Sequence, residues 1–282
     1  MILKTLSSRR TSGLITQSIK YFIMFFLAFT FIMPVFWLIR SAFMAAHQIQ
    51  AFPTIWLPDP ITIASFERAF SLLPIARFFL NSIIITAIVV FSNVIFCSLA
   101  AYTLARKAFR GANLIFNLVL ASMMIPVHIR ITSMYMMSLR LNLQDTYLGV
   151  ALPITVTGFG IFLMRQFFIT LPKEVEDAAV IDGCNDWGVL FRIVIPMSRA
   201  AITSLAIFAF VWSFEDFLWP LIITSSINMR PIQIGIVMFQ GLEIEWGPVM
   251  AAATLTIIPM LIFYICLQKY FVQGMTSGAV KG

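Results

Sequence analysis

The sequence contains few charged residues and few histidines. Only 11% of its 282 residues are charged, and His47 and His128 are its two histidines; soluble domains carry roughly 25% charged residues. With two histidines and no Ser/His/Asp nucleophile context, no catalytic residue and no histidine metal cluster is expected. The cysteines Cys97, Cys184 and Cys266 form no CxxC pair, which disfavours a structural zinc site and a disulfide framework.

A nucleotide-binding motif is also missing. The chain has no Gly-x-x-x-x-Gly-Lys-[Ser/Thr] segment, so it is not expected to hold ATP phosphates in a P-loop. Its formal charge is +7, but most basic residues flank apolar runs and do not alternate with aromatic residues, as they do on nucleic-acid-binding faces. We therefore expect no cofactor or metal on this chain and no nucleic-acid partner.

Long hydrophobic runs dominate what remains, since 60% of the residues are hydrophobic. A helix needs about 20 mostly apolar residues to cross a bilayer, and nothing in lipid satisfies an open backbone. Six stretches meet or approach this length, and we number them spans one to six: 21–39, 78–104, 114–139, 147–168, 200–223 and 249–267. Span one is longer than the ~7–15 residues of a signal-peptide core, so we expect it to be retained.

These runs predict an all-α membrane protein, a bundle of six transmembrane helices forming a single domain over residues 1–282. With the N-terminus inside, alternation of the spans places thirteen lysines and arginines in the cytoplasm and six outside or at membrane depth. This asymmetry satisfies the positive-inside rule. The protein is therefore expected to be multi-pass and surrounded by membrane lipid, with both termini cytoplasmic.

The most polar segment, residues 170–196, lies between spans four and five and is predicted to form a cytoplasmic elbow of two short helices. Thr170 can cap the first helix, and Pro172 suits its first turn. Acidic side chains complement the positive end of a helix dipole. Those available here are Glu174, Glu176 and Asp177.

A sharp turn and a second helix complete the predicted elbow. Gly183 permits a turn that a residue with a side chain would resist. Either Asn185 or Asp186 can then cap the second helix. Its apolar stripe at helical spacing consists of Trp187, Leu190, Phe191 and Val194.

The elbow carries a family resemblance. Asp177-Ala178-Ala179-x-x-Asp182-Gly183, followed by Phe191 and Ile195-Pro196, resembles the EAA signature of permease subunits of binding-protein-dependent ABC importers. In that family the elbow is the coupling helix that docks into a cleft of a cytoplasmic ATPase. This sequence departs by having Asp177 where glutamate is usual and Cys184 where alanine is common. The resemblance implies that the ATPase-coupling residues are Glu176, Asp177, Ala178, Ala179, Asp182, Gly183, Trp187 and Phe191.

Two further segments resemble the carbohydrate, maltose-transporter-type subgroup of these permeases: Phe217 to Leu221, and the tail from Tyr270 to Gly282. The resemblance implies a bacterial cytoplasmic (inner) membrane protein that moves a sugar or related polyol. It also implies four kinds of partner. These are two cytoplasmic ABC ATPases that hold ATP and Mg, a second and non-identical permease chain, an extracytoplasmic sugar-binding protein, and membrane lipid.

Polar residues inside the spans are candidates for the translocation path. Ionisable groups at membrane depth usually face a bundle interior or an aqueous cavity, where they can hydrogen-bond sugar hydroxyls. A structural ion pair, or snorkelling of Arg130, is an equal alternative. A tryptophan here can stack on a sugar, although at a membrane boundary it is mostly an interfacial anchor. The candidates are His128, Arg130, Glu215, Asp216 and Trp219.

Three other interpretations remain open at this point. An ATP-independent secondary transporter or channel would show inverted repeats or broken helices around a midplane site, and the sequence has no internal repeat. A membrane enzyme is suggested by the Asp182-x-x-x-Asp186 spacing, which resembles the magnesium-binding pattern of intramembrane prenyltransferases but lacks a second aspartate motif. An amphipathic surface loop is disfavoured by the acidic first turn.

Overall fold

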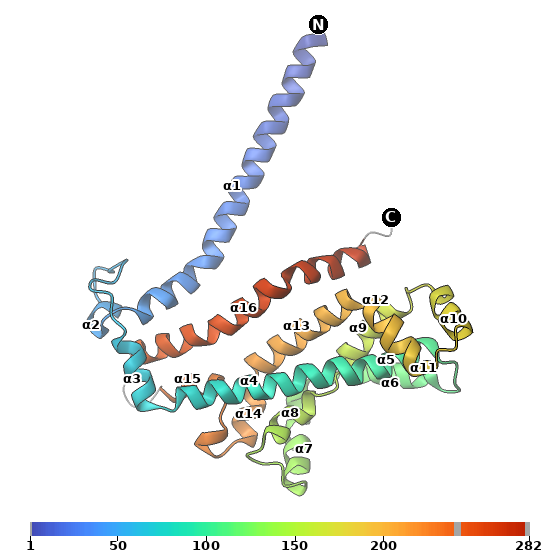
Figure 1. The fold of residues 1–282 in the computed structure, drawn as a ribbon. Coiled ribbons are helices and arrows are strands. Elements are labelled where there is room, and N and C mark those ends of the chain that lie inside the picture. The colour runs from blue at the N-terminus through green and yellow to red at the C-terminus, as the bar shows by residue number, and fades with distance from the viewer. Residues whose placement is uncertain (1, 240–243, 280–282) are drawn as a thin grey trace. The chain divides into compact units, whose positions relative to one another are not determined.

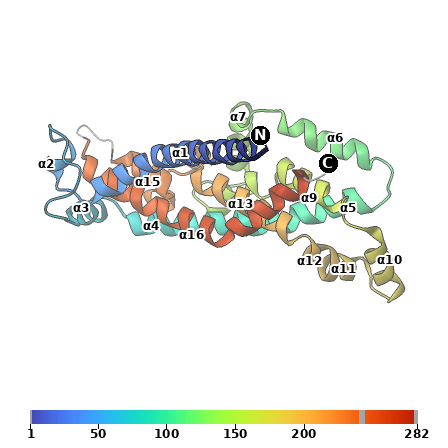
Figure 2. The ribbon, with the colours of Figure 1, turned by 90° about the horizontal axis from the view of Figure 1, so that it is seen from above.

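The structure is a computed structural model that describes residues 2–239 and 244–279, and every element within them is a helix (Figures 1 and 2). The chain divides into two compact units. One consists of Met1–Leu72 with Gly241–Thr254, and the other of Leu73–Gln240 with Leu255–Gly282. The all-helical prediction is confirmed for the described residues, and the prediction of a single domain stays a prediction. The end of the tail, through Gly282, lies outside the described residues.

The first unit contains α1 (Ile2–Ala42), α2 (Ala46–Ile49), α3 (Ala64–Leu72) and the beginning of α16 (Trp246–Ala279). Within α1, residues Gln17–Ala42 are long and apolar enough to cross a membrane, which agrees with predicted span one. At the end of this segment the Arg40 guanidinium lies 4.0 Å from the Trp37 ring centroid and donates to the carbonyl of Ile55. Because the Arg40 side chain is buried, these contacts fix the direction in which the chain leaves α1.

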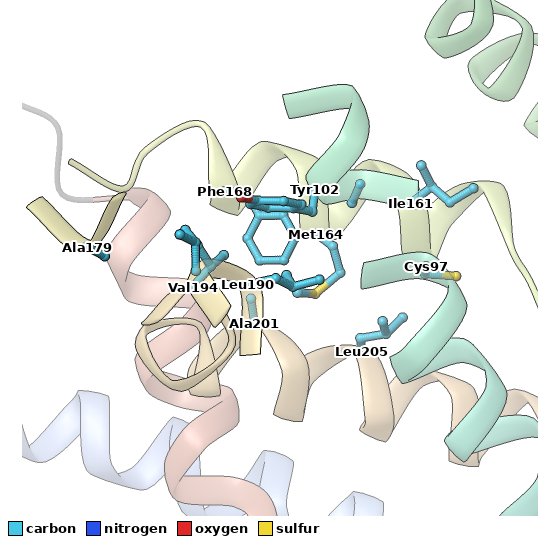
Figure 3. Packing of buried hydrophobic residues seen from close by; sticks show 12 residues of the cluster. Cys97, Tyr102, Ile161, Met164, Phe168, Ala179, Leu190, Val194, Ala201 and Leu205 are labelled. Atoms are coloured by element: carbon cyan, nitrogen blue, oxygen red, sulfur yellow. The ribbon is translucent and has the colours of Figure 1, made fainter. Parts of the chain in front are cut away.

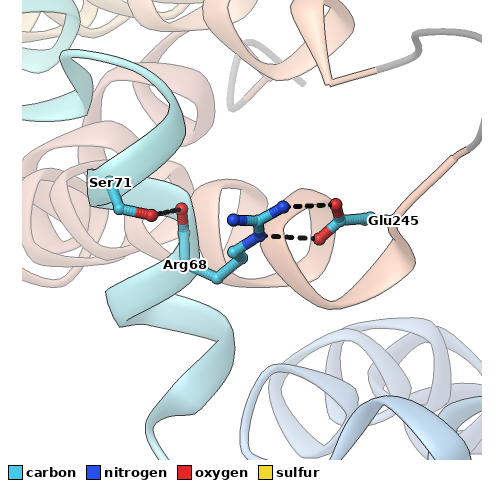
Figure 4. A network of polar contacts seen from close by, with 3 residues as sticks. All are labelled: Arg68, Ser71 and Glu245. Carbon is cyan, nitrogen blue, oxygen red and sulfur yellow. Dashed lines mark hydrogen bonds and ion pairs between the residues drawn. The ribbon is translucent and has the colours of Figure 1, made fainter.

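An ion pair joins α3 to the start of α16 (Figure 4). The Arg68 guanidinium donates to both carboxylate oxygens of Glu245, at 3.0 and 2.8 Å, and the Ser71 hydroxyl donates to the Arg68 carbonyl. Hydrogen bonding from Arg68 lowers the pKa of the Glu245 carboxyl. The pair borders a pocket of about 530 Å³ that Ile49 and Trp246 also line.

The second unit is built around span two, which consists of α4 (Ile75–Ser92), a π-helical turn η1 (Asn93–Cys97) and α5 (Ser98–Arg106). Together they form one uninterrupted span over Ile75–Arg106, which agrees with the predicted range 78–104. Along this span α4 packs against α13 (Arg199–Glu215), and α5 packs against α9 (Gly158–Phe168). The remaining helices of this unit are arranged on that framework.

Predicted spans three, four and five are broken helices. Span three consists of α6 (Ala112–Met123) and α7 (Val127–Arg140), bent by 102°. Pro126 lies at the break, where it has no backbone N–H to continue a helix. Span four consists of α8 (Tyr147–Ala151), η2 (Leu152–Ile154) and α9, bent by 48°.

Span five ends sooner than predicted. Helix α13 stops at Glu215, Asp216 is extended, and α14 (Leu218–Ile223) follows as a separate short helix. By length and composition, the described residues contain three helices able to cross a membrane, or up to six if each bent helix pair is one span. The predicted bundle of six spans is therefore confirmed only when broken spans are counted.

The connection between α14 and α16 is partly helical. It contains η4 (Ile227–Met229) and α15 (Ile232–Met238), and Ile232 and Ile234 are buried. Gly235 of α15 lies so close to α4 that a Cβ there would be 2.3 Å from the Phe78 ring. A glycine is therefore required for α15 to pack directly on span two.

A buried polar cluster joins the π-helical turn of span two to the break in span four. The Asn93 amide donates to the carbonyls of Val89 and Ile154, and its oxygen accepts from the Thr157 hydroxyl at 2.9 Å. Thr157 in turn caps α9 by accepting from the Gly160 N–H. Because lipid offers no hydrogen-bond partner, this cluster satisfies the polar groups that the break would otherwise expose.

Replacing Asn93 should therefore destabilise the membrane domain. Asn93→Leu removes the bonds to Ile154 and Thr157, and hydrogen bonds between membrane helices are worth about 1–2 kcal/mol. We expect a lower unfolding temperature of the detergent-solubilised protein in a thermal-shift measurement. The matched control is Thr103→Val on α5, because the exposed Thr103 hydroxyl bonds only to Leu99 of its own helix among the described contacts. Equal stability of the two variants would contradict this role of Asn93.

Candidate functional site

The elbow predicted over residues 170–196 is present and projects from one end of the α5 and α9 helices in both views (Figures 1 and 2). Its first helix is α10 (Lys173–Ile181). Its second helix consists of α11 (Asp186–Val189), a π-helical turn η3 (Leu190–Val194) and α12 (Ile195–Met197). The second helix joins α13 at a bend of 80°.

The start of the elbow differs from the prediction in its cap. The Thr170 hydroxyl donates to the Phe167 carbonyl at 2.7 Å and so terminates α9, which makes the predicted Thr170 cap of the next helix wrong. Pro172 occupies the N-cap position itself. Glu174 and Glu176 lie in the first turn of α10 as predicted, where they complement the positive end of its dipole.

The turn between the two elbow helices is a Schellman motif. The Cys184 N–H donates to the Ala179 carbonyl, and the Gly183 N–H donates to the Val180 carbonyl. Gly183 has φ +87°, a left-handed conformation that explains the glycine. Asn185 caps α11 by accepting from the Gly188 N–H at 2.8 Å, so of the two predicted caps Asn185 is the one used.

One face of the elbow is buried in an apolar core (Figure 3). Ala179, Leu190 and Val194 have exposed fractions of 5% or less and pack with Tyr102 of α5 and Phe168 of α9. Burial of each of the larger apolar side chains stabilises the folded state by about 1.5–3 kcal/mol. The elbow is therefore a fixed part of the second unit and not a loose loop.

The opposite face of the elbow is exposed and apolar. Trp187 and Phe191 stack on each other with ring centroids 6.0 Å apart, although both are more than half exposed. The predicted apolar stripe of the second helix is therefore split between an inner and an outer face. Val180 and Ile181, which the sequence analysis did not single out, add apolar surface, and Ile181 is 85% exposed. We call Val180, Ile181, Trp187 and Phe191 the outer elbow face.

The predicted coupling residues also separate between the two faces. Glu176 and Ala179 point inward, whereas the others are exposed: Asp177, Ala178, Asp182, Gly183, Trp187 and Phe191. A pocket of about 500 Å³ between Asp182 and Arg192 opens beside the outer elbow face. The exposed set is therefore the part of the elbow that a partner protein can contact.

Two ion pairs attach the elbow to the end of α5. Arg106 Nε lies 2.8 Å from Glu176 Oε1, and these side chains are only 5% and 13% exposed. Arg106 Nη2 also donates to the Leu171 carbonyl at 2.8 Å. Lys107 Nζ lies 2.6 Å from Asp186 Oδ1, and hydrogen bonding to Asp186 raises the pKa of the Lys107 ammonium group. From the sequence, Arg106 and Lys107 are recognised only as two of the basic residues expected in the cytoplasm.

The residues predicted to line the translocation path lie on α7, at the end of α13 and in α14. His128 and Arg130 are exposed on α7, and Glu215 is exposed at the end of α13. Asp216 accepts a bond from the backbone N–H of Trp219 at 3.4 Å. These four remain predictions as path residues.

Trp219 has a structural role in this conformation. It is 4% exposed, packs among residues of α4 and α8, and its indole N–H donates to the Gly149 carbonyl at 3.1 Å. Its ring is buried and its donor is used here, and its stacking on a substrate stays a prediction. Trp212 of α13, by contrast, is 46% exposed and contacts Phe159 and Phe208 with centroid separations of 5.1 and 5.6 Å.

Helices of membrane-spanning composition, several of them broken, and an anchored elbow with an exposed apolar face define a multi-pass helical membrane protein. Residues 93–277 match the family described as "binding-protein-dependent transport system inner membrane component". The chain belongs to this family of importer permeases.

Similar proteins agree with this assignment. The chain is 33% identical to the arabinooligosaccharides transport system permease protein AraQ of Halalkalibacterium halodurans, over 91% of this chain and 94% of that protein. It is 32% identical to the trehalose/maltose transport system permease protein MalG of Thermococcus litoralis, over 88% of this chain and 91% of that protein. A bacterial ABC transporter that imports alginate, an acidic polysaccharide, shares the fold, with a TM-score of 0.80 over 92% of this chain and 98% of that chain at 20% identity.

The left-handed turn at Gly183 provides a test of the elbow. Gly183→Val forces a β-branched side chain to φ +87°, which costs at least about 1–2 kcal/mol. We expect the variant to insert in the membrane but to lose substrate uptake, measured in cells with labelled substrate. Gly111→Val is the matched control, because Gly111 has φ +93°, equally open surroundings and a position outside the elbow. Normal uptake by Gly183→Val would contradict the assignment.

Proposed function

We propose that this chain is the permease subunit of an ABC importer that moves a sugar or related polyol across a bacterial inner membrane. The outer elbow face is the observation that carries the proposal. An exposed apolar surface rimmed by polar residues marks a protein-interaction site, and an acidic elbow fits a protein partner better than anionic lipid. The sugar class is supported by the arabinooligosaccharide and trehalose/maltose relatives.

In this proposal a cytoplasmic ABC ATPase receives the outer elbow face in a cleft. Ile181 and Trp187 supply apolar anchors, and Asp177 and Asp182 supply charge at the rim. The ATPases hold ATP and Mg, and this chain binds no cofactor. Closure of two ATPases on nucleotide then moves the elbow and switches the permease between two states of access, a bistable transition biased by ligand.

The substrate path is proposed to pass an aromatic group formed by Phe159 of α9 with Phe208 and Trp212 of α13. Aromatic rings present large apolar faces with a polar edge, which suits the C–H face of a sugar ring. Trp212 is proposed to stack on the sugar, because its side chain is half exposed. Glu215 and Asp216, at the end of the same helix, are proposed to bind hydroxyl groups, and His128 and Arg130 to do so from α7.

The assembly is proposed to contain two ATPases, a second and non-identical permease chain, and an extracytoplasmic sugar-binding protein. The second permease completes a path that one chain only half encloses. The distribution of lysine and arginine supports a cytoplasmic position for both termini. With this orientation the elbow faces the ATPases, and the loops of the first unit that follow α1 face the binding protein.

An ATP-independent transporter is the alternative function, because such transporters are built with broken helices like those found here. Uptake that survives ATP depletion and collapses with the ion gradient would support that alternative. Mass spectrometry of proteins that co-purify with the tagged chain in mild detergent separates the two functions. An ABC ATPase and a second permease are expected; recovery of a stable homo-oligomer alone would contradict the importer.

Charge on the outer elbow face should prevent ATPase binding. Ile181→Glu places a carboxylate on a side chain that is 85% exposed, so folding is preserved while the apolar anchor is lost. We expect the ATPase recovered with the tagged chain to fall by roughly tenfold or more, as for an interface hot spot. The control is Ile61→Glu, because Ile61 is 73% exposed and lies outside the elbow. Equal recovery with both variants would show that this face is not the docking surface.

A further inference from the structure

The elbow is linked covalently to two spans only, through α9 at its start and α13 at its end. Span two has no chain connection to the elbow, yet its last residues make the two ion pairs with it. We infer that Arg106 and Lys107 form a clamp that makes span two move with the elbow when an ATPase displaces it. Both are thus positioning residues for coupled transport, an inference that rests on the proposed function.

The clamp reaches both helices of the elbow from adjacent residues. Arg106 pairs with Glu176 on α10, and Lys107 pairs with Asp186 at the start of α11. The Arg106 guanidinium also holds the connection between α9 and α10 by donating to the Leu171 carbonyl. These attachments lie on either side of the Gly183 turn. A rotation of the elbow about one ion pair would therefore break the other, so α5 has to move with the elbow.

The two ion pairs differ in strength because they differ in burial. The Arg106 and Glu176 side chains are 5% and 13% exposed, and charges removed from water attract each other more strongly than exposed ones. Breaking such a pair leaves one buried charge without a partner, which is strongly unfavourable. The Lys107 and Asp186 side chains are 40% and 68% exposed, so salt screens their attraction. Arg106 is therefore the main attachment.

Span two can transmit this motion across the membrane domain. Its α5 segment packs on α9, and its α4 segment packs on α13 and on the buried glycine of α15. The π-helical turn η1 lies between the two segments, and such turns are frequent at functional sites in helices. A displacement of the elbow is thus delivered to span two directly, as well as to span five through the chain.

The test uses the complete transporter, reconstituted in liposomes with its ATPases, second permease and binding protein. Substrate taken up per ATP hydrolysed is measured for the native chain and for Arg106→Gln. We expect this ratio to fall about tenfold, within the range of typical coupling between sites, while the ATPase still co-purifies and hydrolyses ATP. Arg110→Gln is the control, because Arg110 is an exposed cation in the connection between α5 and α6, close to Arg106 in the chain.

Exchange of the charges distinguishes a clamp from a residue needed only for folding. The double variant Arg106→Glu with Glu176→Arg restores an ion pair of opposite direction, and we expect it to recover most of the lost ratio. If Arg106→Gln does not fold, Lys107→Gln serves instead, because the Lys107 side chain is 40% exposed. Its ratio should fall by up to about fivefold at low salt and less at high salt.

Two results would overturn the clamp. One is an unchanged ratio of uptake to ATP hydrolysis in every folded variant of Arg106 and Lys107. The other is a charge exchange that folds and binds the ATPase but recovers none of the ratio lost in Arg106→Gln. Failure of the proposed function is a different observation, since in that case the native chain itself does not bind an ATPase.

Discussion

One apolar core fixes the elbow to α5 and α9, and transmission of motion from the elbow to the spans depends on this attachment. Leu190 and Val194 of the second elbow helix are buried against Tyr102 and Phe168, side chains from spans two and four. A surface segment held only by its ends would absorb a partner's force by bending. A segment whose inner face belongs to a close-packed core transmits displacement, because packed interiors have low compressibility.

Burial of one face also determines what the elbow presents to a partner. With Ala179 and Leu190 directed inward, the outer face is left with Ile181, Trp187 and Phe191. All three side chains are more than half exposed, although Trp187 and Phe191 stack on each other. Their position next to charged Asp177 and Asp182 gives an apolar centre with a polar edge, which is the anatomy of a protein interface.

The breaks in spans three to five must meet a second constraint, the absence of hydrogen-bond partners in lipid. Polar side chains satisfy backbone groups at the break in span four and where the chain leaves α14. Asn93 serves the break in span four, and the Asp145 carboxylate accepts from Ser225 and Ser226 where the chain leaves α14. Breaks protected in this way can act as hinges without exposing backbone to lipid.

The sequence predicted the number of spans, the position of the elbow and its turn at Gly183. These depend on local composition and on a single backbone conformation, which residue patterns report directly. It did not predict the end of α13 at Asp216, because apolar residues continue on both sides of this point. Nor did it predict that Trp219 is buried, since hydrophobicity alone does not distinguish an exposed tryptophan from one whose N–H meets a distant carbonyl.

The sequence predicted which residues form the elbow but not which of them are buried. The elbow motif identified residues by type, but the division into inner and outer faces depends on which side meets the bundle. Helical periodicity placed Leu190 and Phe191 in one stripe, whereas the structure buries the first and exposes the second. The partners of Glu176 and Asp186 were also hidden, because Arg106 and Lys107 are about 70 to 80 residues away in the chain.

The central claim is that the outer elbow face contacts the ATPase, and site-specific cross-linking tests it most directly. A photoreactive amino acid is placed at position 181 of the chain in native membranes and activated with light. We expect a covalent product with an ABC ATPase from position 181. The same product should not form when the probe is at position 61. Cross-linking from position 181 only to lipid or to this chain itself, in membranes that support uptake, would contradict the central claim.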